Sequence, residues 1–142
     1  MKDVYVLDAC ALIALLKGEH GGDKVLAVYE KADKGNATII INKVNLFEVY
    51  YEFYRNDGKE YAEKILDRII QSPIIKILET TYDVFKEAGY WKTSKKYKIS
   101  FADSFALAQA VVLGGLLMTA DHHEFDIIEQ FGEENITFYW IR

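Results

Sequence analysis

Short apolar runs alternate along this chain with longer segments in which apolar residues recur at helical spacing. The unbroken run Val4-Tyr5-Val6-Leu7 predicts a strand buried on both faces, because a half-exposed strand would alternate apolar and polar residues. Further strands are expected at 38–41, 74–77, 116–118 and 136–140. Helices are expected at 9–16, 23–34, 43–55, 59–71, 81–94, 101–113 and 122–131.

Strands that alternate with helices predict an α/β fold in which a parallel sheet lies between helices. Glycines separate the expected elements, Pro73 is the only proline, and no repeat or linker interrupts the pattern. We therefore expect a single domain over residues 1–142. Sheets of this class bind ligands in a crevice beyond the carboxyl ends of their strands, so the chemistry is expected there.

Composition narrows the classes of function. Hydrophobic residues make up 51% of the 142 positions and charged residues 27%, which excludes a disordered or fibrous chain. The 17 Lys and Arg against 22 Asp and Glu give a net charge of −5, which argues against nucleic-acid binding through overall positive charge but not against local contacts. A single cysteine, no secretory leader and no 18-residue apolar run favour a cytoplasmic protein without a membrane segment.

Four carboxylates occupy positions that should meet in this crevice. Asp8 directly follows the first strand, and Asp121 lies just beyond the strand at 116–118, with Thr119 between. Glu48 and Asp103 each interrupt an otherwise apolar helix face, where an ionised group needs a partner. We expect these side chains to converge at one edge of the sheet.

Helix capping is the alternative explanation for several of these acids. Asp8 and Asp121 could be N-caps, and Ser100-Phe101-Ala102-Asp103 fits a capping box, whereas no cap explains Glu48. Four converging carboxylates would repel one another unless a cation neutralised them. Oxygen ligands without a nearby cysteine cluster favour Mg²⁺ or Mn²⁺, as one ion or two, and an activated water could then attack phosphorus.

At these residues the chain resembles the PIN domain, and within it the small VapC-type ribonuclease toxins. The resemblance covers essentially the whole chain and rests on the motifs at 6–12, 45–48, 99–104 and 118–121. It implies a three-layer α/β/α fold with a central parallel sheet in the order 3-2-1-4-5. It also implies Mg²⁺- or Mn²⁺-dependent cleavage of single-stranded RNA, homodimerisation, and often a small antitoxin protein as partner.

Carried over residue by residue, the resemblance assigns the acidic quartet of the family to Asp8, Glu48, Asp103 and Asp121. Glu124 matches a variable fifth acid of the family. Many members carry Thr or Ser directly after the first Asp, where this chain has Ala9, and the hydroxyls of Thr119 and Ser104 could serve instead.

Basic and aromatic residues suggest where a substrate could bind. The segment 92–98 contains Lys95, Lys96 and Lys98, and its lysines could contact phosphates while Trp91 and Tyr97 stack on unpaired bases. A solvated loop between two helices explains the same residues. Lys43, at the start of the helix that bears Glu48, could also reach the substrate or could serve only solubility. Arg55 has the same two interpretations.

Three further features have structural interpretations. The aromatic residues of helix 43–55 exceed what one face can bury, and together with Tyr61 and Ile65 they could form an apolar patch for a second subunit or a partner's peptide. Cys10 follows a buried strand and is expected to be a small core residue. His122 and His123 are expected to lie exposed at a helix start, since adjacent helical residues point in different directions.

The leading hypothesis is a metal-dependent endoribonuclease, the toxin of a toxin–antitoxin pair. The alternatives are a PIN-like RNA-processing nuclease without an antitoxin, a catalytically silent interaction module, and a phosphatase acting on small phosphoesters. An Asp-x-Asp phosphatase motif is absent, because Cys10 stands two residues after Asp8.

Overall fold

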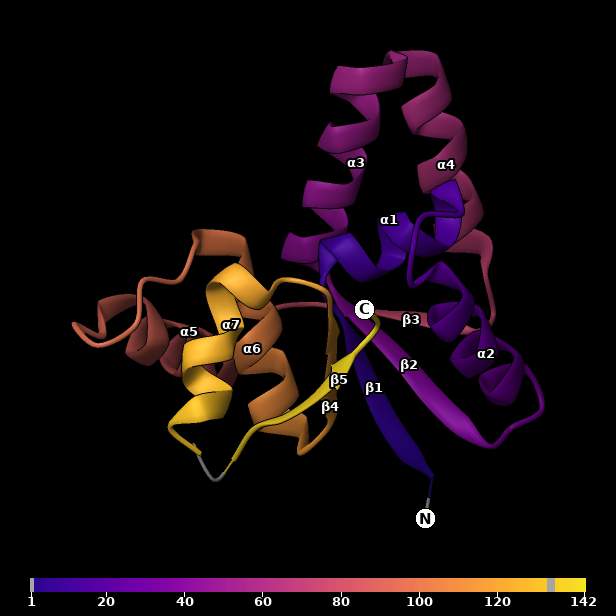
Figure 1. Cartoon of the computed structure of the whole chain (residues 1–142). Helices are drawn as coiled ribbons and strands as arrows, with labels where there is room; N and C mark the ends of the chain where they lie inside the picture. Colours follow the sequence, from indigo (N-terminus) through magenta and orange to yellow (C-terminus); the bar gives the residue numbers. More distant parts are fainter. Residues whose placement is uncertain (1, 133–134) are drawn as a thin grey trace.

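The fold is built around a parallel sheet, which the computed structural model describes over residues 2–132 and 135–142 (Figure 1). Its strands are β1 (Asp3–Leu7), β2 (Ala37–Asn42), β3 (Ile75–Leu78), β4 (Leu116–Thr119) and β5 (Thr137–Trp140). They lie in the order β3-β2-β1-β4-β5, and every neighbouring pair is parallel. The strand order 3-2-1-4-5 is therefore confirmed.

Helices cover both faces of the sheet and complete a three-layer α/β/α arrangement (Figure 1). They are α1 (Ala9–Lys17), α2 (Gly22–Asp33), α3 (Lys43–Asp57), α4 (Lys59–Gln71), α5 (Tyr82–Thr93), α6 (Phe101–Leu113) and α7 (His122–Gln130). Tyr5 and Leu7 pack into one core cluster with α1 to α4, whereas Val6 packs into the other with α5 to α7. Burial on both faces explains why β1 is an unbroken apolar run.

Helices α3 and α4 form a hairpin that projects away from the sheet (Figure 1). Helix α3 extends two residues beyond the expected end at 55, and Gly58, with φ of 89°, caps it in a conformation that favours glycine. The inner faces of the hairpin are apolar, and Phe53 and Ile65 are buried there. The prediction that Ile65 belongs to an exposed patch is therefore wrong, whereas the aromatic residues expected beside it are exposed: Phe47, Tyr51, Tyr54 and Tyr61.

The order in which strands are added to the sheet reverses at β1, which lies between β2 and β4. A crevice forms at such a switch point, because the connections leaving the two neighbouring strands run to opposite faces. Asp8 directly follows β1, and Asp121 lies two residues beyond β4, so both acids stand at this edge. Among the described residues, no helix combines the length and apolar character needed to cross a bilayer.

Candidate active site

Asp8 is held rigidly at the start of α1. Its side chain is 1% exposed, and its Oδ1 accepts hydrogen bonds from the Ala11 backbone N–H at 2.9 Å and from the Cys10 thiol at 3.1 Å. Asp8 is therefore the N-cap of α1, as one of the two sequence interpretations predicted. The cap uses only Oδ1, so the other carboxylate oxygen of Asp8 remains able to bind a ligand in the crevice.

Asp121 has the same arrangement at the start of α7. Its Oδ1 accepts from the Glu124 backbone N–H at 3.0 Å, and its own backbone N–H donates to the Thr119 hydroxyl at 2.9 Å. The hydroxyl of Thr119 also bonds to Asp8 and lowers the pKa of that carboxyl. Thr119 thus contacts both strand-end acids, as expected for a hydroxyl that supports the site.

The two remaining acids of the quartet come from helices. Glu48 lies half-buried on α3, and Asp103 lies 9% exposed in the first turn of α6. Ser100 caps α6 by accepting from the Asp103 backbone N–H at 3.3 Å. The return bond of the expected capping box comes from Glu124, whose Oε1 accepts from the Ser100 backbone N–H at 3.2 Å. The carboxylate of Asp103 is therefore not used as a cap.

All four acids line one pocket of about 270 Å³. Its wall is completed by Ala9, Cys10, Ile13, Glu19 and Glu52. None of the described lining residues is Lys or Arg. A cavity that gathers carboxylates without a protein cation is suited to a divalent metal ion, because Mg²⁺ and Mn²⁺ prefer oxygen ligands.

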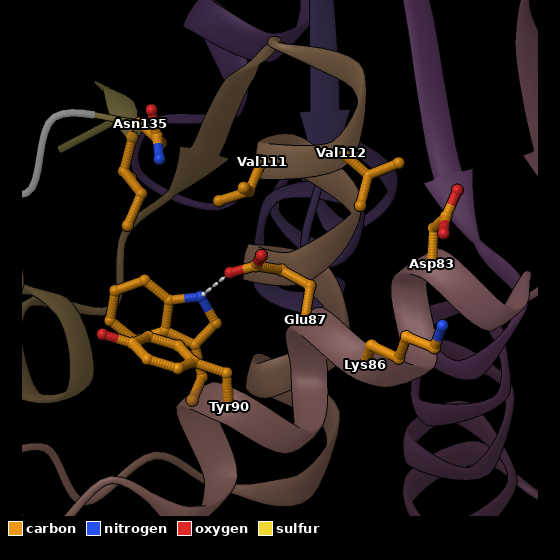
Figure 2. Close-up of a pocket in the computed structure, with 9 residues that line it drawn as sticks. Asp83, Lys86, Glu87, Tyr90, Val111, Val112 and Asn135 are labelled. Atoms are coloured by element: carbon orange, nitrogen blue, oxygen red, sulfur yellow. Dashed lines mark hydrogen bonds between the residues drawn. The ribbon is translucent and has the colours of Figure 1, made fainter.

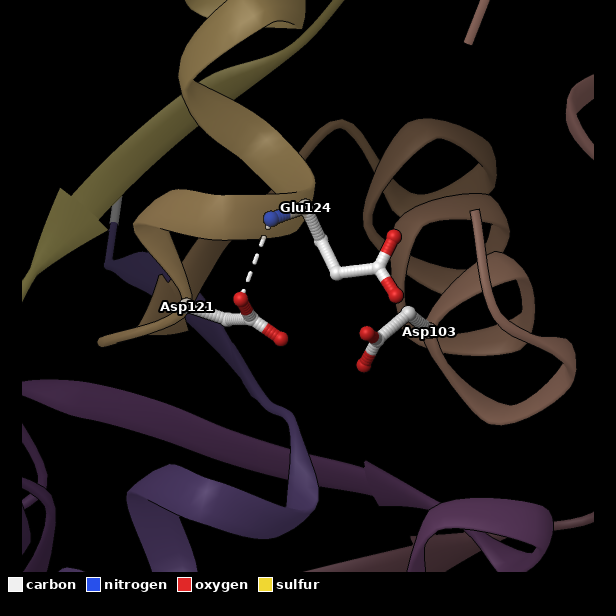
Figure 3. A group of neighbouring side chains, drawn as sticks. All are labelled: Asp103, Asp121 and Glu124. Atoms are coloured by element: carbon white, nitrogen blue, oxygen red, sulfur yellow. Dashed lines mark hydrogen bonds between the residues drawn. The ribbon is translucent and has the colours of Figure 1, made fainter. Parts of the chain in front are cut away.

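Three carboxylates approach one another most closely. Figure 3 shows the side chains of Asp103, Asp121 and Glu124 pointing toward a common space, and one oxygen from each lies within 4.8 Å of the others. The Oε2 atom of Glu124 is buried without a hydrogen-bond partner among the described residues. The fifth acid therefore lies beside the quartet.

The electrostatics of the pocket favour neutral, protonated carboxyls over charged ones. Burial, followed by the nearby charge of Asp8, raises the pKa of Asp103 to about 8, and Asp121 and Glu124 add to the shift. Burial also raises the pKa of Asp8 and of Glu48. In the absence of a cation these carboxyls hold their protons more tightly than they would in water, whereas a divalent ion would favour the ionised forms.

Cys10 is not the core residue that the sequence suggested, because it is only partly buried and lines the acidic pocket. Burial, followed by the charge of Asp8, raises the pKa of its thiol, so the group stays protonated and donates to Asp8. Sequence reasoning missed this donor, although its position two residues after the first acid was the available signal. The hydroxyl of Ser104 donates to the Phe101 carbonyl at 2.6 Å within its own helix, and Ser104 is not among the described residues that line the pocket.

The predicted base-stacking pair is wrong. Trp91 and Tyr97 are 3% and 4% exposed and pack in the core beneath α6 and α7, so neither ring can reach a nucleobase. Lys95, Lys96 and Lys98 are exposed, and the Lys96 ammonium lies 3.8 Å from the centre of the Phe131 ring. This segment therefore combines a solvated surface with buried anchors.

Lys43 is exposed at the start of α3, where its ammonium pairs with Glu79 at 2.7 Å. Arg55 pairs with Glu52 at 2.6 Å, one turn below it on the same helix. His122 is exposed, as predicted for a helix start, and its ring stacks on Trp140 with centroids 4.0 Å apart. These side chains thus have partners within the chain.

A larger hollow of about 470 Å³ lies between α5 and the last turns of α6 (Figure 2). Its lining includes Asp83, Lys86, Glu87 and Tyr90, and Glu87 accepts a hydrogen bond from the indole N–H of Trp91 at 2.7 Å. None of the predicted acids lines it, so its size does not mark the acidic site.

The fold and the pocket define an α/β protein with a cluster of carboxylates at the switch point of its sheet. The sequence profile of the PIN domain matches residues 5–129, and the chain therefore belongs to the PIN domain family. No curated protein sequence matches the chain.

Solved structures with the same fold share little sequence with this chain. VapBC2 from Rickettsia felis, bound to a promoter DNA fragment, has a TM-score of 0.74 at 20% identity, covering 96% of this chain and 98% of the other. DNA-bound VapBC from Salmonella typhimurium has a TM-score of 0.73 at 14% identity over 100% of both chains. VapC20 from Mycobacterium tuberculosis, a toxin that cleaves the sarcin–ricin loop, has a TM-score of 0.57 at 18% identity, covering 80% and 86%.

Proposed function

We propose that this protein is a metal-dependent endoribonuclease that hydrolyses phosphodiester bonds of single-stranded RNA. The observation that carries the proposal is the pocket lined by Asp8, Glu48, Asp103 and Asp121, with no Lys or Arg among its described lining residues. Membership of the PIN domain family supports the same reaction class. The four acids would hold Mg²⁺ or Mn²⁺, as one ion or two, and Glu124 would be an accessory acid.

The bound ion would supply a water of lowered pKa and neutralise charge on the phosphate. The chain itself provides preorganisation. The Ala11 N–H and the Cys10 thiol fix the carboxylate of Asp8, and the Glu124 N–H fixes that of Asp121. Because these donors belong to helix starts packed on the sheet, the acids need little reorganisation when substrate binds.

Contacts with RNA phosphates are assigned to exposed lysines outside the acidic pocket. Lys43 begins the helix that carries Glu48, and Lys95, Lys96 and Lys98 precede the helix that carries Asp103. Their ammonium groups would provide the local positive charge that a chain of net charge −5 lacks overall.

A toxin role with a small antitoxin partner is the favoured biological setting, because the solved structures described above are toxin–antitoxin complexes or a toxin. An RNA-processing nuclease without an antitoxin would use the same pocket. Expression of the wild-type chain and of Asp103→Asn in a bacterial host distinguishes the two settings. A toxin arrests growth only with the acid intact, whereas a processing nuclease leaves growth unaffected.

A homodimer is proposed through an aromatic surface on α5 and α6, which we define as Tyr82, Phe85, Phe101 and Phe105. Tyr82 and Phe101 are 79% and 64% exposed, and ring contacts of 5.1 to 6.3 Å join the four side chains into one patch. A second copy would cover this apolar surface. Light scattering should give a dimer mass for the wild type and a monomer mass for Phe85→Glu; a wild-type monomer contradicts the proposal.

Mn²⁺ titration and RNA cleavage test the proposed reaction together. The wild type should bind Mn²⁺ stoichiometrically and cut single-stranded RNA until EDTA is added. Asp8→Asn and Asp103→Asn should lose both properties while keeping the circular dichroism spectrum, and Glu63→Gln, on the exposed face of α4, should keep both. Metal binding without cleavage would favour the silent interaction module, and turnover of a small phosphoester alone would favour the phosphatase.

A further inference from the structure

Asn45 connects the two helices that carry acids of the pocket. It lies on α3, three residues before Glu48, and its side chain is 0% exposed. Its Nδ2 donates to the Ala102 carbonyl at 2.9 Å, and Ala102 directly precedes Asp103 on α6. This side-chain hydrogen bond joins the first turns of α3 and α6.

The relative position of these helices sets the distance between two acids. Glu48 and Asp103 both line the pocket, Glu48 from α3 and Asp103 from α6. Helix α3 projects from the sheet as one arm of the hairpin in Figure 1. A shift of α3 relative to α6 would change the distance between the two carboxyls, and the Asn45 hydrogen bond opposes such a shift.

The stability of the fold does not by itself explain an asparagine at this position. Asn45 Oδ1 is buried and has no hydrogen-bond partner among the described residues. An unpaired buried acceptor costs about 1–3 kcal/mol, whereas an apolar residue of the same size would bury no such atom. Ala102 lies in the first turn of α6, where its carbonyl can accept the helical hydrogen bond without Asn45.

We propose that Asn45 is a positioning residue. It holds Glu48 and Asp103 at the separation at which both carboxylates can bind the same divalent cation. The inference rests on the proposed metal-dependent function. Asn45 touches neither substrate nor metal in this role. Its effect passes through the Ala102 carbonyl to the first turn of α6 and through α3 to Glu48.

A second buried hydrogen bond of α6 provides a matched control. Asn42 Nδ2 donates to Gln109 Oε1 at 2.9 Å, and both side chains are buried. Gln109 lies on α6 six residues beyond Asp103 and does not line the acidic pocket. Removing the Gln109 acceptor should reduce stability by leaving the buried Asn42 Nδ2 donor unpaired. It should not move the acids, because Asn42 Oδ1 still accepts from the Val44 backbone N–H and caps α3.

The experiment compares Asn45→Leu with Gln109→Met, because each replacement is close in size to the original side chain. The Mn²⁺ dissociation constant is measured by the electron paramagnetic resonance signal of free Mn²⁺, and stability by urea unfolding in EDTA. Asn45→Leu should weaken Mn²⁺ binding by roughly 10-fold or more while unfolding in EDTA at a urea concentration no lower than that of the wild type. Gln109→Met should unfold at lower urea and keep its Mn²⁺ affinity.

Asn45→Ser is the second variant, since its short side chain cannot span to Ala102 yet fits any packing that accepts Asn. It should show the same loss of Mn²⁺ affinity, and excess Mn²⁺ should restore RNA cleavage in both Asn45 variants. Equal Mn²⁺ affinity in the wild type and the Asn45 variants would overturn this inference and leave the proposed function standing. A wild type that binds no Mn²⁺ would overturn both.

Discussion

Replacing Asp103 by Asn should flatten the pH dependence of the stability of the metal-free protein. The pKa of Asp103 is raised to about 8 from its ordinary value of 3.8, chiefly by burial. The folded state therefore binds this proton more tightly than the unfolded chain does, so the stability contributed by the proton is lost as pH rises from 4 through 8. Between pH 5 and pH 8 the loss is about 1.4 kcal/mol per pH unit, or about 4 kcal/mol in total.

Urea unfolding in EDTA at pH 5 and pH 8 measures this difference. The wild type should lose stability over the interval, Asp103→Asn should lose several kcal/mol less, and Asp67→Asn, an exposed acid on α4, should behave as the wild type. Mn²⁺ should restore wild-type stability at pH 8, because the ion favours the ionised carboxylates. The reasoning is refuted if Asp103→Asn and the wild type have the same pH dependence.

Three further changes test the fold and the substrate contacts. Gly21→Ala should lower the free energy of unfolding by about 2 kcal/mol or more, because φ is +93° and a Cβ would lie 2.6 Å from the Ile141 carbonyl oxygen. Gly35→Ala, where φ is +82° and nothing lies within 4 Å of the added Cβ, should lose about 1 kcal/mol, and equal losses in urea would contradict the close contact at Gly21. Phe125→Ala should lower stability by about 3–5 kcal/mol, since the ring is fully buried between α7 and the sheet, and a loss below about 1 kcal/mol would contradict this packing. Lys43→Ala should change the free energy of unfolding by less than about 1 kcal/mol, because its ion pair with Glu79 is exposed. It should reduce the slope of log Kd against log salt concentration for single-stranded RNA by about 0.7, and an unchanged slope would remove Lys43 from the RNA contacts.

The elements of the fold follow closely from local patterns. Unbroken apolar runs marked the buried strands, and the expected helix at 101–113 coincides with α6 because Ser100 caps its start and Gly114 ends it. The end of α3 was placed two residues too early, at 55, because the apolar pattern fades there, whereas the helix continues to Asp57 and ends at Gly58. The strand order came from the family resemblance, since periodicity carries no information about which strands become neighbours.

The acidic quartet was visible in the sequence because carboxylates at strand ends and on apolar helix faces are unusual. Two of the hydrogen bonds around the site were not visible in the sequence. The Glu124 bond to Ser100 and the Asn45 bond between α3 and α6 join residues whose proximity depends on how whole helices pack.

The aromatic residues illustrate the same boundary between local and tertiary information. Trp91 and Tyr97 flank lysines in the sequence and suggested stacking on bases, yet both rings are core residues. Exposed aromatic residues lie instead on α5 and α6, as at Tyr82 and Phe101, and on α3 and α4, as at Phe47 and Tyr61. Sequence alone determined which residues are apolar, which are acidic, and where helices and strands begin, because these depend on short-range periodicity and capping. Tertiary structure decided which side of each helix meets water and which acids share a pocket, because both depend on contacts between segments far apart in the chain.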